Sequence, residues 1–289
     1  MTLALPHRDG PCLRWDAPVS TDLRAGAKPP ILLLHGFLDA AGSWDRVAPQ
    51  LAAAGHPVCA LDLRGHGEGY RAGAHDYYHF SDYLLDLDNF LQNARIFEAP
   101  FVLVGHSMGG MVGTLFAGTY PARVSHFVNV EGLGPPETDP DSNPARMRTF
   151  VEGVRKVRAQ APTSATREEM LRRLELAHAG IAREVLEQKL VYLAQEIEPG
   201  RFVWRYDPLH RTRGPTPFRV SVFEAFARAI TAKVLYVSGG HNGFTVTGAE
   251  QRLTAFADLT RVTLEGAGHM VHWTQPDALA AAILAHVRT

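Results

Sequence analysis

Short apolar runs alternate with longer amphipathic segments through the first half of the chain. Each apolar run is short enough to be a strand buried on both faces, and each continues into a turn that contains glycine. These runs lie at residues 31–36, 57–69, 100–110 and 124–132. Segments with helical spacing separate them, at residues 43–55, 81–94 and 111–120. Such alternation predicts right-handed crossovers and a mostly parallel sheet with helices on both faces.

The alternation stops near residue 135 and returns near residue 232. Residues 135–145 are rich in Pro, Asp and Asn, and the chain then has helical spacing to about residue 230, interrupted by a turn region at 199–217. The helical segments lie at residues 145–160, 166–179, 182–196 and 220–230. Strand-like runs resume at 232–240 and 260–266, and a helix follows at 277–288. We therefore predict an α/β core of residues 1–134 and 232–289 with a helical cap insertion at 135–231.

The composition supports one globular protein and gives no sign of a charged macromolecular partner. Hydrophobic residues make up 46% of the chain and charged residues 20%, which is enough for a sizeable core and argues against disorder. The formal net charge is −1, from 29 basic and 30 acidic residues, so no field draws the protein toward nucleic acid or an anionic membrane. No segment reaches the roughly 18 apolar residues that a membrane span needs. We expect a small-molecule partner.

Two features bear on the cellular compartment. The chain has only two cysteines, and Cys59 lies in an apolar run where cysteine commonly serves as a small apolar residue. We therefore expect Cys12 and Cys59 to be free thiols in a reducing compartment. Residues 1–30 contain three aspartates and five prolines without a continuous apolar stretch, which is unlike a signal peptide. The resulting expectation is a cytoplasmic protein.

The sequence GHSMG at residues 105–109 has the G-x-S-x-G pattern, between a predicted strand and a predicted helix. A turn this tight needs glycines to avoid clashes, and it lifts the serine side chain above the sheet. Ser107 would also lie at a helix N-terminus, where the free N–H groups and the helix dipole favour negative charge. We predict that Ser107 is a nucleophile.

A nucleophilic serine needs a base, and His269 is the best-placed of fourteen histidines. It follows a late strand in the glycine-rich segment 266–273, at the sheet edge where open α/β sheets build their sites. His35, His66 and His106 occupy turns at the same edge and are expected to be packed or hydrogen-bonded histidines. His75 and His79 have helical spacing for a metal pair but no evident third ligand. We predict no metal and no cofactor.

At this point the chain resembles the α/β-hydrolase superfamily. The residues that carry the resemblance are LLLHGF at 32–37, DLRGHGEG at 62–69, VGHSMGG at 104–110 and GAGHMVHWTQPDAL at 266–279. Their order and spacing, with the cap insertion, fit over residues 25–289. The resemblance implies that backbone N–H groups of Met108 and Phe37, or alternatively Leu38, form an oxyanion hole.

The acid of the expected triad departs from the usual family pattern. Most members place an Asp in the loop after the penultimate strand, but Asn242 occupies that position here. Glu131 follows the strand after the nucleophile helix, and in some members of the superfamily the acid comes from that loop. We predict that Glu131 orients His269 and stabilises its imidazolium form. The alternatives are that Glu131 is a turn carboxylate facing solvent, or that Asn242 pairs with His269 in a weakened dyad.

A serine nucleophile implies acyl chemistry on a small carboxylic ester through an acyl-enzyme intermediate. Thioesters, lactones, amides and C–C bonds use related machinery. The alternatives are therefore a C–C bond hydrolase of a dienoate-type ring-cleavage product, which needs a cationic pocket, and a non-catalytic small-molecule receptor. Arginines of the cap either face water or reach down to bind an acidic substrate. The residues expected to bind substrate are His106, Leu38, Trp273 and Asn242.

Overall fold

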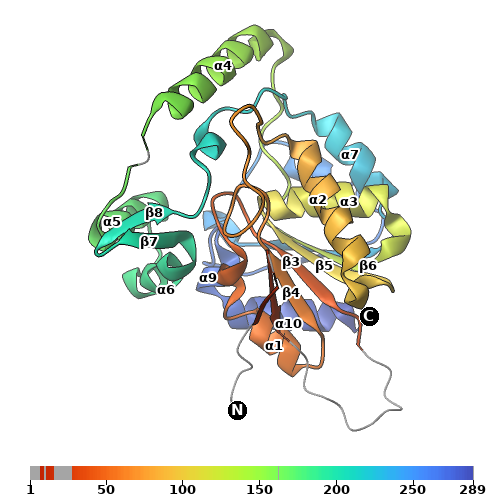
Figure 1. Cartoon of the computed structure of the whole chain (residues 1–289). Coiled ribbons are helices and arrows are strands. Elements are labelled where there is room, and N and C mark those ends of the chain that lie inside the picture. Colours follow the sequence, from red (N-terminus) through yellow and green to blue (C-terminus); the bar gives the residue numbers. More distant parts are fainter. Residues whose placement is uncertain (1–6, 10, 16–27, 162, 289) are drawn as a thin grey trace.

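The fold is built on one eight-stranded sheet in a computed structural model that describes residues 7–9, 11–15, 28–161 and 163–288 (Figure 1). The strand order is β1-β2-β4-β3-β5-β6-β9-β10; β1 and β2 run antiparallel to their neighbours, and the other six strands are parallel. The strands are β1 (His7–Asp9), β2 (Cys12–Trp15), β3 (Ile31–Leu34), β4 (Val58–Leu61), β5 (Phe101–His106), β6 (Val124–Val130), β9 (Lys233–Ser238) and β10 (Leu259–Thr263). The predicted fold class is confirmed.

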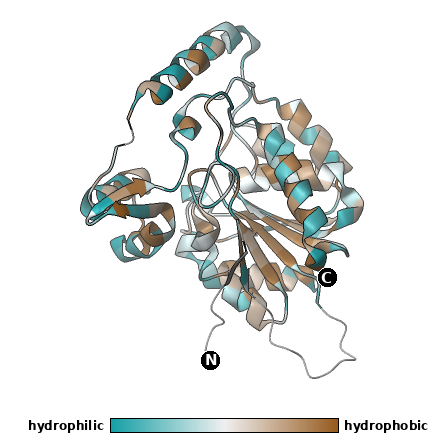
Figure 2. Ribbon diagram, in the orientation of Figure 1, coloured by the Kyte–Doolittle hydropathy of each residue, from teal (hydrophilic) through white to brown (hydrophobic). Residues whose placement is uncertain are grey.

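Helices cover both faces of the sheet, and the strands are buried on both sides as their sequences predict. Along β3, Leu32 and Leu34 pack into one core cluster, whereas Ile31 and Leu33 pack into the other, which is the period-two alternation of a strand. The first cluster lies under α2 (Phe80–Asn93), α3 (Met108–Thr119), α7 (Val220–Ala229) and α8 (Ala249–Leu253). The second lies under α1 (Ala48–Ala53), α9 (Val271–Thr274) and α10 (Pro276–Val287). Figure 2 shows the hydrophobic strands between these layers.

The insertion between β6 and β9 contains helices and a hairpin. Its elements are α4 (Asn143–Ala159), α5 (Arg167–Ala177), α6 (Arg183–Leu193), β7 (Ala194–Glu198) and β8 (Arg201–Trp204). The sequence predicted helix through residue 196 and an irregular turn after 199, but β7 and β8 pair antiparallel instead. Gly200, with φ of 73°, closes the turn between them. Pairing with an aromatic-rich partner strand therefore overrides the helix propensity of Ala194–Glu196.

The end of the insertion belongs structurally to the core. Helix α7 packs against α3, and its residues Phe223 and Ala227 join the core cluster beneath that helix. Helix α6 is attached to the core by a separate contact. The fully buried Lys189 of α6 donates to the Ser43 carbonyl (3.1 Å) and contacts the Asp45 carboxylate. Figure 1 shows α4 standing apart from α5 and α6. The cap boundary at residue 231 stays a prediction, and we propose that the cap ends before α7.

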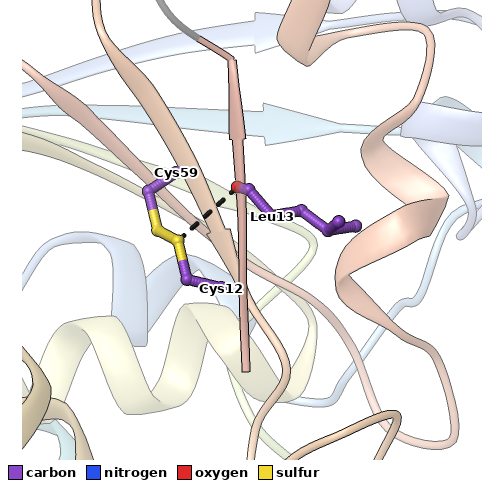
Figure 3. Close-up of a disulfide and its surroundings, with 3 residues drawn as sticks. All are labelled: Cys12, Leu13 and Cys59. Atoms are coloured by element: carbon purple, nitrogen blue, oxygen red, sulfur yellow. Dashed lines mark hydrogen bonds between the residues drawn. A yellow bond between two sulfur atoms is a disulfide. The ribbon is translucent and has the colours of Figure 1, made fainter. Parts of the chain in front are cut away.

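Cys12 and Cys59 form a disulfide in the structure, so the expectation of two free thiols is wrong (Figure 3). Strand β2 adds to the sheet edge antiparallel to β4, with Arg14 opposite Cys59 and Cys12 opposite Leu61. This register brings the two cysteine Cα atoms to 6.2 Å, with both side chains in the same core cluster. The sequence indicated only that Cys59 is buried, because β2 was not predicted and the pairing depends on it.

In the described part of the chain, no helix has the length and apolar character that crossing a bilayer requires. The prediction about a signal peptide concerns residues 1–30, and most of these lie outside the described residues. The cytoplasmic location stays a prediction.

Candidate active site

Ser107 occupies a strained turn between β5 and α3. Its backbone has φ of 51° and ψ of −113°, and Leu38, Ser107 and Glu131 are the non-glycine residues with positive φ in the described part of the chain. A Cβ atom on Gly105 would lie 2.3 Å from the Gly109 carbonyl oxygen, so the turn can close only with glycine at that position. Strained backbone of this kind concentrates at functional sites. All three strained residues lie at the carboxyl edge of the sheet.

His269 contacts both Ser107 and Glu131. Its Nε2 atom lies 3.0 Å from the Ser107 Oγ, and its Nδ1 atom lies 3.3 Å from Glu131 Oε2. The loop after β10 can turn back over the sheet because Gly266 and Gly268 adopt positive φ angles of 75° and 68°. The Glu131 carboxylate accepts a hydrogen bond from the Nδ1–H group of His269, so Nε2 presents its lone pair to the serine hydroxyl. The structure thus brings together the three residues that were predicted as catalytic.

The Glu131 carboxylate is buried and held by backbone donors. The residue is 2% exposed, Gly239 N–H donates to Oε1 (2.6 Å), and Phe244 N–H donates to Oε2. A Cβ atom on Gly243 would lie 2.6 Å from Oε1, so glycine lets the loop approach the carboxylate. These two bonds hold the carboxylate in place beside the His269 ring. A solvent-facing turn carboxylate does not fit this position.

Asn129 fixes the turn that carries Glu131, and the sequence analysis missed this role. Its side chain is fully buried in β6, accepts from the Gly132 N–H (2.8 Å) and donates to the Gly132 carbonyl (3.2 Å). These two bonds close the backbone around Glu131, whose φ is 56°. A polar residue within the apolar run of 127–130 was the available signal, because a buried amide needs partners.

The loop after β9 lacks the usual acid but still contributes to the site. It supplies the Gly239 and Phe244 N–H groups that hold Glu131. Asn242, predicted as a substrate or histidine contact, is exposed, lies in the 3-10 helix Gly240–Asn242, and has no hydrogen bond to His269. A weakened dyad of Asn242 and His269 therefore lacks the required contact. The loop supports a carboxylate that comes from the neighbouring strand.

The turn after β3 presents one free N–H group beside the nucleophile. Leu38 N–H donates to His66 Nε2 (3.1 Å), so it is not available as the alternative oxyanion donor. The N–H groups of Phe37 and Met108 have no acceptor among the residues that the structure describes. His35 supports the same turn, because its Nε2 accepts from the Leu63 N–H at 3.0 Å. The N–H groups of the two predicted oxyanion donors, Phe37 and Met108, are thus free to meet a substrate oxygen.

We expect His66→Phe to lower kcat about fivefold to tenfold with little change in KM. The phenyl ring keeps the stacking on His210, whose ring centroid lies 4.2 Å away, but it cannot accept from Leu38. The phenyl ring also loses the hydrogen bond of Nδ1 to the Arg64 carbonyl (3.0 Å); each lost bond is worth about 1 kcal/mol, and loss of the Leu38 bond loosens the turn that carries Phe37. Steady-state kinetics on an ester substrate check this, with the exposed His75→Phe as control. Unchanged kcat in His66→Phe would show that this bond does not position the turn.

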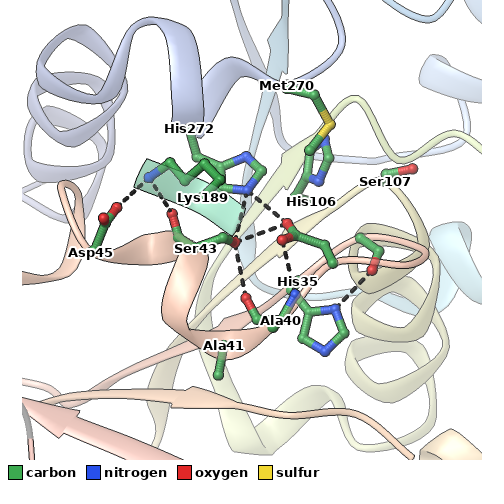
Figure 4. A network of polar contacts seen from close by, with 12 residues as sticks. His35, Ala40, Ala41, Ser43, Asp45, His106, Ser107, Lys189, Met270 and His272 are labelled. Carbon is green, nitrogen blue, oxygen red and sulfur yellow. Dashed lines mark hydrogen bonds and ion pairs between the residues drawn. The ribbon is translucent and has the colours of Figure 1, made fainter. Parts of the chain in front are cut away.

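A second buried polar network lies beneath the site (Figure 4). His272 Nε2 donates to Asp39 Oδ2 (2.9 Å), and the Ser43 hydroxyl donates to the same oxygen (2.9 Å). Burial raises the pKa of Asp39, but the hydrogen bond from His272 outweighs burial and lowers the pKa of Asp39 to about 2. The ionised Asp39 also accepts from the Ala40 N–H at 2.8 Å. This network fixes the loop that follows the oxyanion turn.

His106 belongs to this buried layer and does not contact the pocket. It is 1% exposed, and its Nε2 donates to the His269 carbonyl oxygen (2.8 Å). Burial lowers its pKa well below the usual value, so the ring is neutral. The substrate contact predicted for His106 is therefore wrong, because the side chain points into the core under the catalytic loop. Its position instead supports the backbone of His269.

Asp39, His106 and His272 are the described residues whose ligand atoms lie close enough to suggest a metal site, within 4.8 Å of one another. His272 Nε2 and the Ser43 hydroxyl both already donate to Asp39 Oδ2. All three residues are buried in the network beneath the site. We interpret the group as a hydrogen-bonded support.

A pocket of about 620 Å³ lies between the cap and the oxyanion turn. Its floor comes from the core, and its walls come from α5, the end of α6, β8 and the 3-10 helix Pro208–Arg211. The lining residues are Phe37, Leu38, Asp39, Arg173, Leu174, Leu176, Ala177, His178, Leu193, Trp204, Tyr206, Arg211, Met270 and Trp273. Leu38 and Trp273 thus lie where they were predicted to lie. The sequence analysis did not single out the individual cap residues.

Buried neutral histidines predict a loss of stability in acid. His210 stacks between His66 and Tyr78, and burial lowers its pKa to about 4 despite an opposing hydrogen bond to the Arg64 carbonyl. Between about pH 6.5 and pH 4 the unfolded chain binds this proton and the native state does not. The free energy of unfolding then falls as the pH falls, by about 1.4 kcal/mol per pH unit for each such group.

Urea unfolding at pH 7, 6 and 5 measures this slope. We expect the wild type to lose stability across the series and His210→Phe to lose less per pH unit, because one titrating group is gone while the stacked ring remains. Equal slopes for the two proteins would contradict the assignment.

Comparison with known proteins shows the family to which this fold belongs. Residues 29–276 match the family described as alpha/beta hydrolase fold. The chain therefore belongs to the α/β-hydrolase fold family. Ser107 occupies the strained turn at the start of α3 in this fold.

The chain is also similar to individual proteins. It is 27% identical over 271 residues to human Serine hydrolase-like protein 2, covering 88% of this chain and 85% of that protein. It is 34% identical over 109 residues to Methylesterase 7 of Arabidopsis thaliana, covering 38% of this chain and 42% of that protein. The chain thus spans less than half the length of this relative. The thioesterase domain from the curacin biosynthetic pathway is 26% identical, with 95% and 94% coverage and a TM-score of 0.79.

Proposed function

We propose that this protein is a carboxylesterase that hydrolyses a small ester through a Ser107–His269–Glu131 triad. The observation that carries the proposal is the 3.0 Å contact between Ser107 Oγ and His269 Nε2, with Glu131 on the opposite ring nitrogen. Relatives named methylesterase and thioesterase domain support acyl chemistry. The pocket beside the oxyanion turn supplies space for a small substrate.

Acylation follows from the order of the contacts. His269 Nε2 accepts the Ser107 proton as Oγ attacks the ester carbonyl carbon. The carbonyl oxygen gains the negative charge and is met by the N–H groups of Phe37 and Met108, the latter at the positive end of α3. Glu131 stabilises the imidazolium that forms. When the tetrahedral adduct collapses, the C–O bond to the alcohol breaks and His269 gives the proton to the leaving oxygen.

Deacylation repeats the steps with water. His269 takes a proton from a water molecule that attacks the acyl carbon of the Ser107 ester, and the oxyanion again meets the two backbone donors. Collapse returns the proton to Ser107 Oγ and releases the carboxylic acid. His269 is 35% exposed at its side chain, so water can reach its Nε2 face.

Steady-state hydrolysis of 4-nitrophenyl esters from acetate to palmitate tests the proposal, with Ser107→Ala as the blank. We expect turnover that peaks at one chain length and disappears in the blank. A folded protein that turns over none of the series would not be a carboxylesterase of this type. Binding of the esters without turnover would favour a receptor.

A second candidate is a C–C bond hydrolase of a dienoate-type product of ring cleavage. The observation that favours it is the presence of Arg173 and Arg211 on the pocket wall, since such a substrate carries a carboxylate. Loss of the dienoate absorbance in the presence of the wild type, but not of Ser107→Ala, would support this candidate. Ester turnover without dienoate turnover would dismiss it.

A further inference from the structure

Two arginines from different cap elements line the pocket. Arg173 comes from α5 and Arg211 ends the 3-10 helix Pro208–Arg211, and both side chains remain solvent-accessible. Most of the remaining lining is apolar, including Leu174, Met270 and Trp273. A charge beside apolar walls interacts more strongly with an opposite charge than it does in open water.

Neither arginine forms an ion pair among the described residues; the charge of Arg173 acts on Glu169, one helical turn away and outside the pocket lining. No carboxylate of the described residues lies within 4.0 Å of either guanidinium, and Asp39 is the one acid among the residues that line the pocket. Two other arginines of the insertion are paired: Arg183 contacts three glutamates, and Arg205 contacts Glu68 (2.6 Å). The two pocket arginines therefore have no carboxylate in ion-pair contact among the described residues.

Asp39 does not neutralise them. Its carboxylate is 3% exposed and is turned toward His272, Ser43 and the Ala40 N–H. The hydrogen bonds that hold it there satisfy both of its oxygens. The pocket therefore carries a net positive charge on the cap side.

Tyr206 lies near both guanidinium groups on the cap side of the pocket. Arg211 Nη1 lies 3.5 Å from the Tyr206 hydroxyl, the limit of a hydrogen bond. Burial raises the pKa of Tyr206, and the charges of both Arg211 and Arg173 act against that rise. Both cations are thus within electrostatic reach of one phenol. Two guanidinium groups and one hydroxyl donor form a site that suits a carboxylate.

We infer that the preferred substrate is an anionic ester, whose chain ends in a carboxylate held by Arg173 and Arg211. This inference rests on the proposed esterase function and adds the substrate class. The ester group lies at Ser107, the chain runs over the apolar floor, and the distal carboxylate meets the arginines. Half-esters of dicarboxylic acids have this layout. Neutral esters of equal length fill the same volume but leave both cations without a partner.

Paired substrates that differ only in the distal charge test the inference. Mono-4-nitrophenyl adipate and suberate carry the carboxylate, and their methyl-capped diesters are neutral controls of matched length. We expect the wild type to favour the anionic member at least tenfold in kcat/KM. Arg173→Gln and Arg211→Gln should each reduce that preference about tenfold, mainly through a higher KM for the anionic ester.

Neighbouring arginines provide matched control variants. Arg172→Gln and Arg213→Gln remove the same charge from exposed residues that do not line the pocket. We expect both to keep the preference for the anionic ester. An equal loss in these variants would show that net charge, rather than the pocket, attracts the substrate, and would overturn the inference. A wild type that hydrolyses the neutral diester as well as the half-ester would also overturn it.

Calorimetric titration of adipate and suberate into Ser107→Ala separates this inference from the proposed function. Binding that Arg173→Gln or Arg211→Gln weakens at least tenfold supports the anionic pocket whether or not esters are turned over. No measurable binding of either dicarboxylate overturns it. Absence of ester turnover in the wild type counts against the esterase function alone.

Discussion

Ser107→Ala is expected to lower kcat for an ester substrate on the order of 10⁵-fold, the largest effect of any single change in this protein. The alanine removes the oxygen that His269 contacts at 3.0 Å, so no acyl-enzyme can form. The residual rate would come from the oxyanion donors and from substrate binding. Alanine at this position keeps the N-terminus of α3, so the fold should remain intact. Steady-state kinetics with a burst-phase measurement of acyl-enzyme check both points.

Ser43→Ala is the control that the structure itself provides. Ser43, His272 and Asp39 also bring a serine, a histidine and an acid together, but Ser43 and Asp39 both contact the same nitrogen of His272. Ser43 is fully buried, so no substrate carbonyl can reach its hydroxyl. We expect Ser43→Ala to retain turnover within about tenfold. Retention by Ser107→Ala together with loss in Ser43→Ala would reverse the assignment of the nucleophile.

Glu131→Gln is expected to lower kcat about 10²–10⁴-fold, the second largest effect. The amide is nearly isosteric, but it carries no charge to stabilise the imidazolium of His269. It also presents an NH₂ group to a site where the Gly239 and Phe244 N–H groups need acceptors. The side chain is therefore expected to lose hydrogen bonds as well as charge.

Glu250→Gln is the matched control for the acid. Glu250 is an exposed carboxylate of α8 that pairs with Arg261 at 2.6 Å. Removing its charge should change kcat by less than about twofold, because exposed ion pairs contribute little. A large loss in Glu250→Gln with a small loss in Glu131→Gln would contradict the proposed triad. Circular dichroism on both variants separates catalytic loss from unfolding.

The nucleophile turn and the buried strands could be predicted from short stretches of sequence. The nucleophile turn depends on Gly105 and Gly109 on either side of Ser107, and this requirement is local. The buried strands could also be recognised from local sequence, because runs such as residues 31–34 are apolar at every position. By contrast, the hairpin of β7 and β8 was missed, since its strands are stabilised by each other rather than by their own sequence pattern.

Contacts between distant segments could be recognised only in the folded protein. His106 was predicted as a substrate contact because its turn faces the site, but packing of α9 and the Asp39 loop covers it. The Cys12–Cys59 pair depends on the register of a strand that the pattern did not reveal. Asn242 stands in the usual position of the acid, yet its loop contributes backbone donors to Glu131.

The sequence by itself determined the fold class and predicted the nucleophile turn, a candidate base and a candidate acid, because each depends on local spacing or on the order of strands along one sheet edge. The tertiary structure decided how these residues meet. It placed the Gly239 and Phe244 N–H groups on Glu131, engaged the Leu38 N–H with His66, and put Arg173 and Arg211 beside the pocket without an ion pair among the described residues. These features arise from side chains and backbone groups far apart in the chain, whose distances are set only when the cap and the sheet pack together.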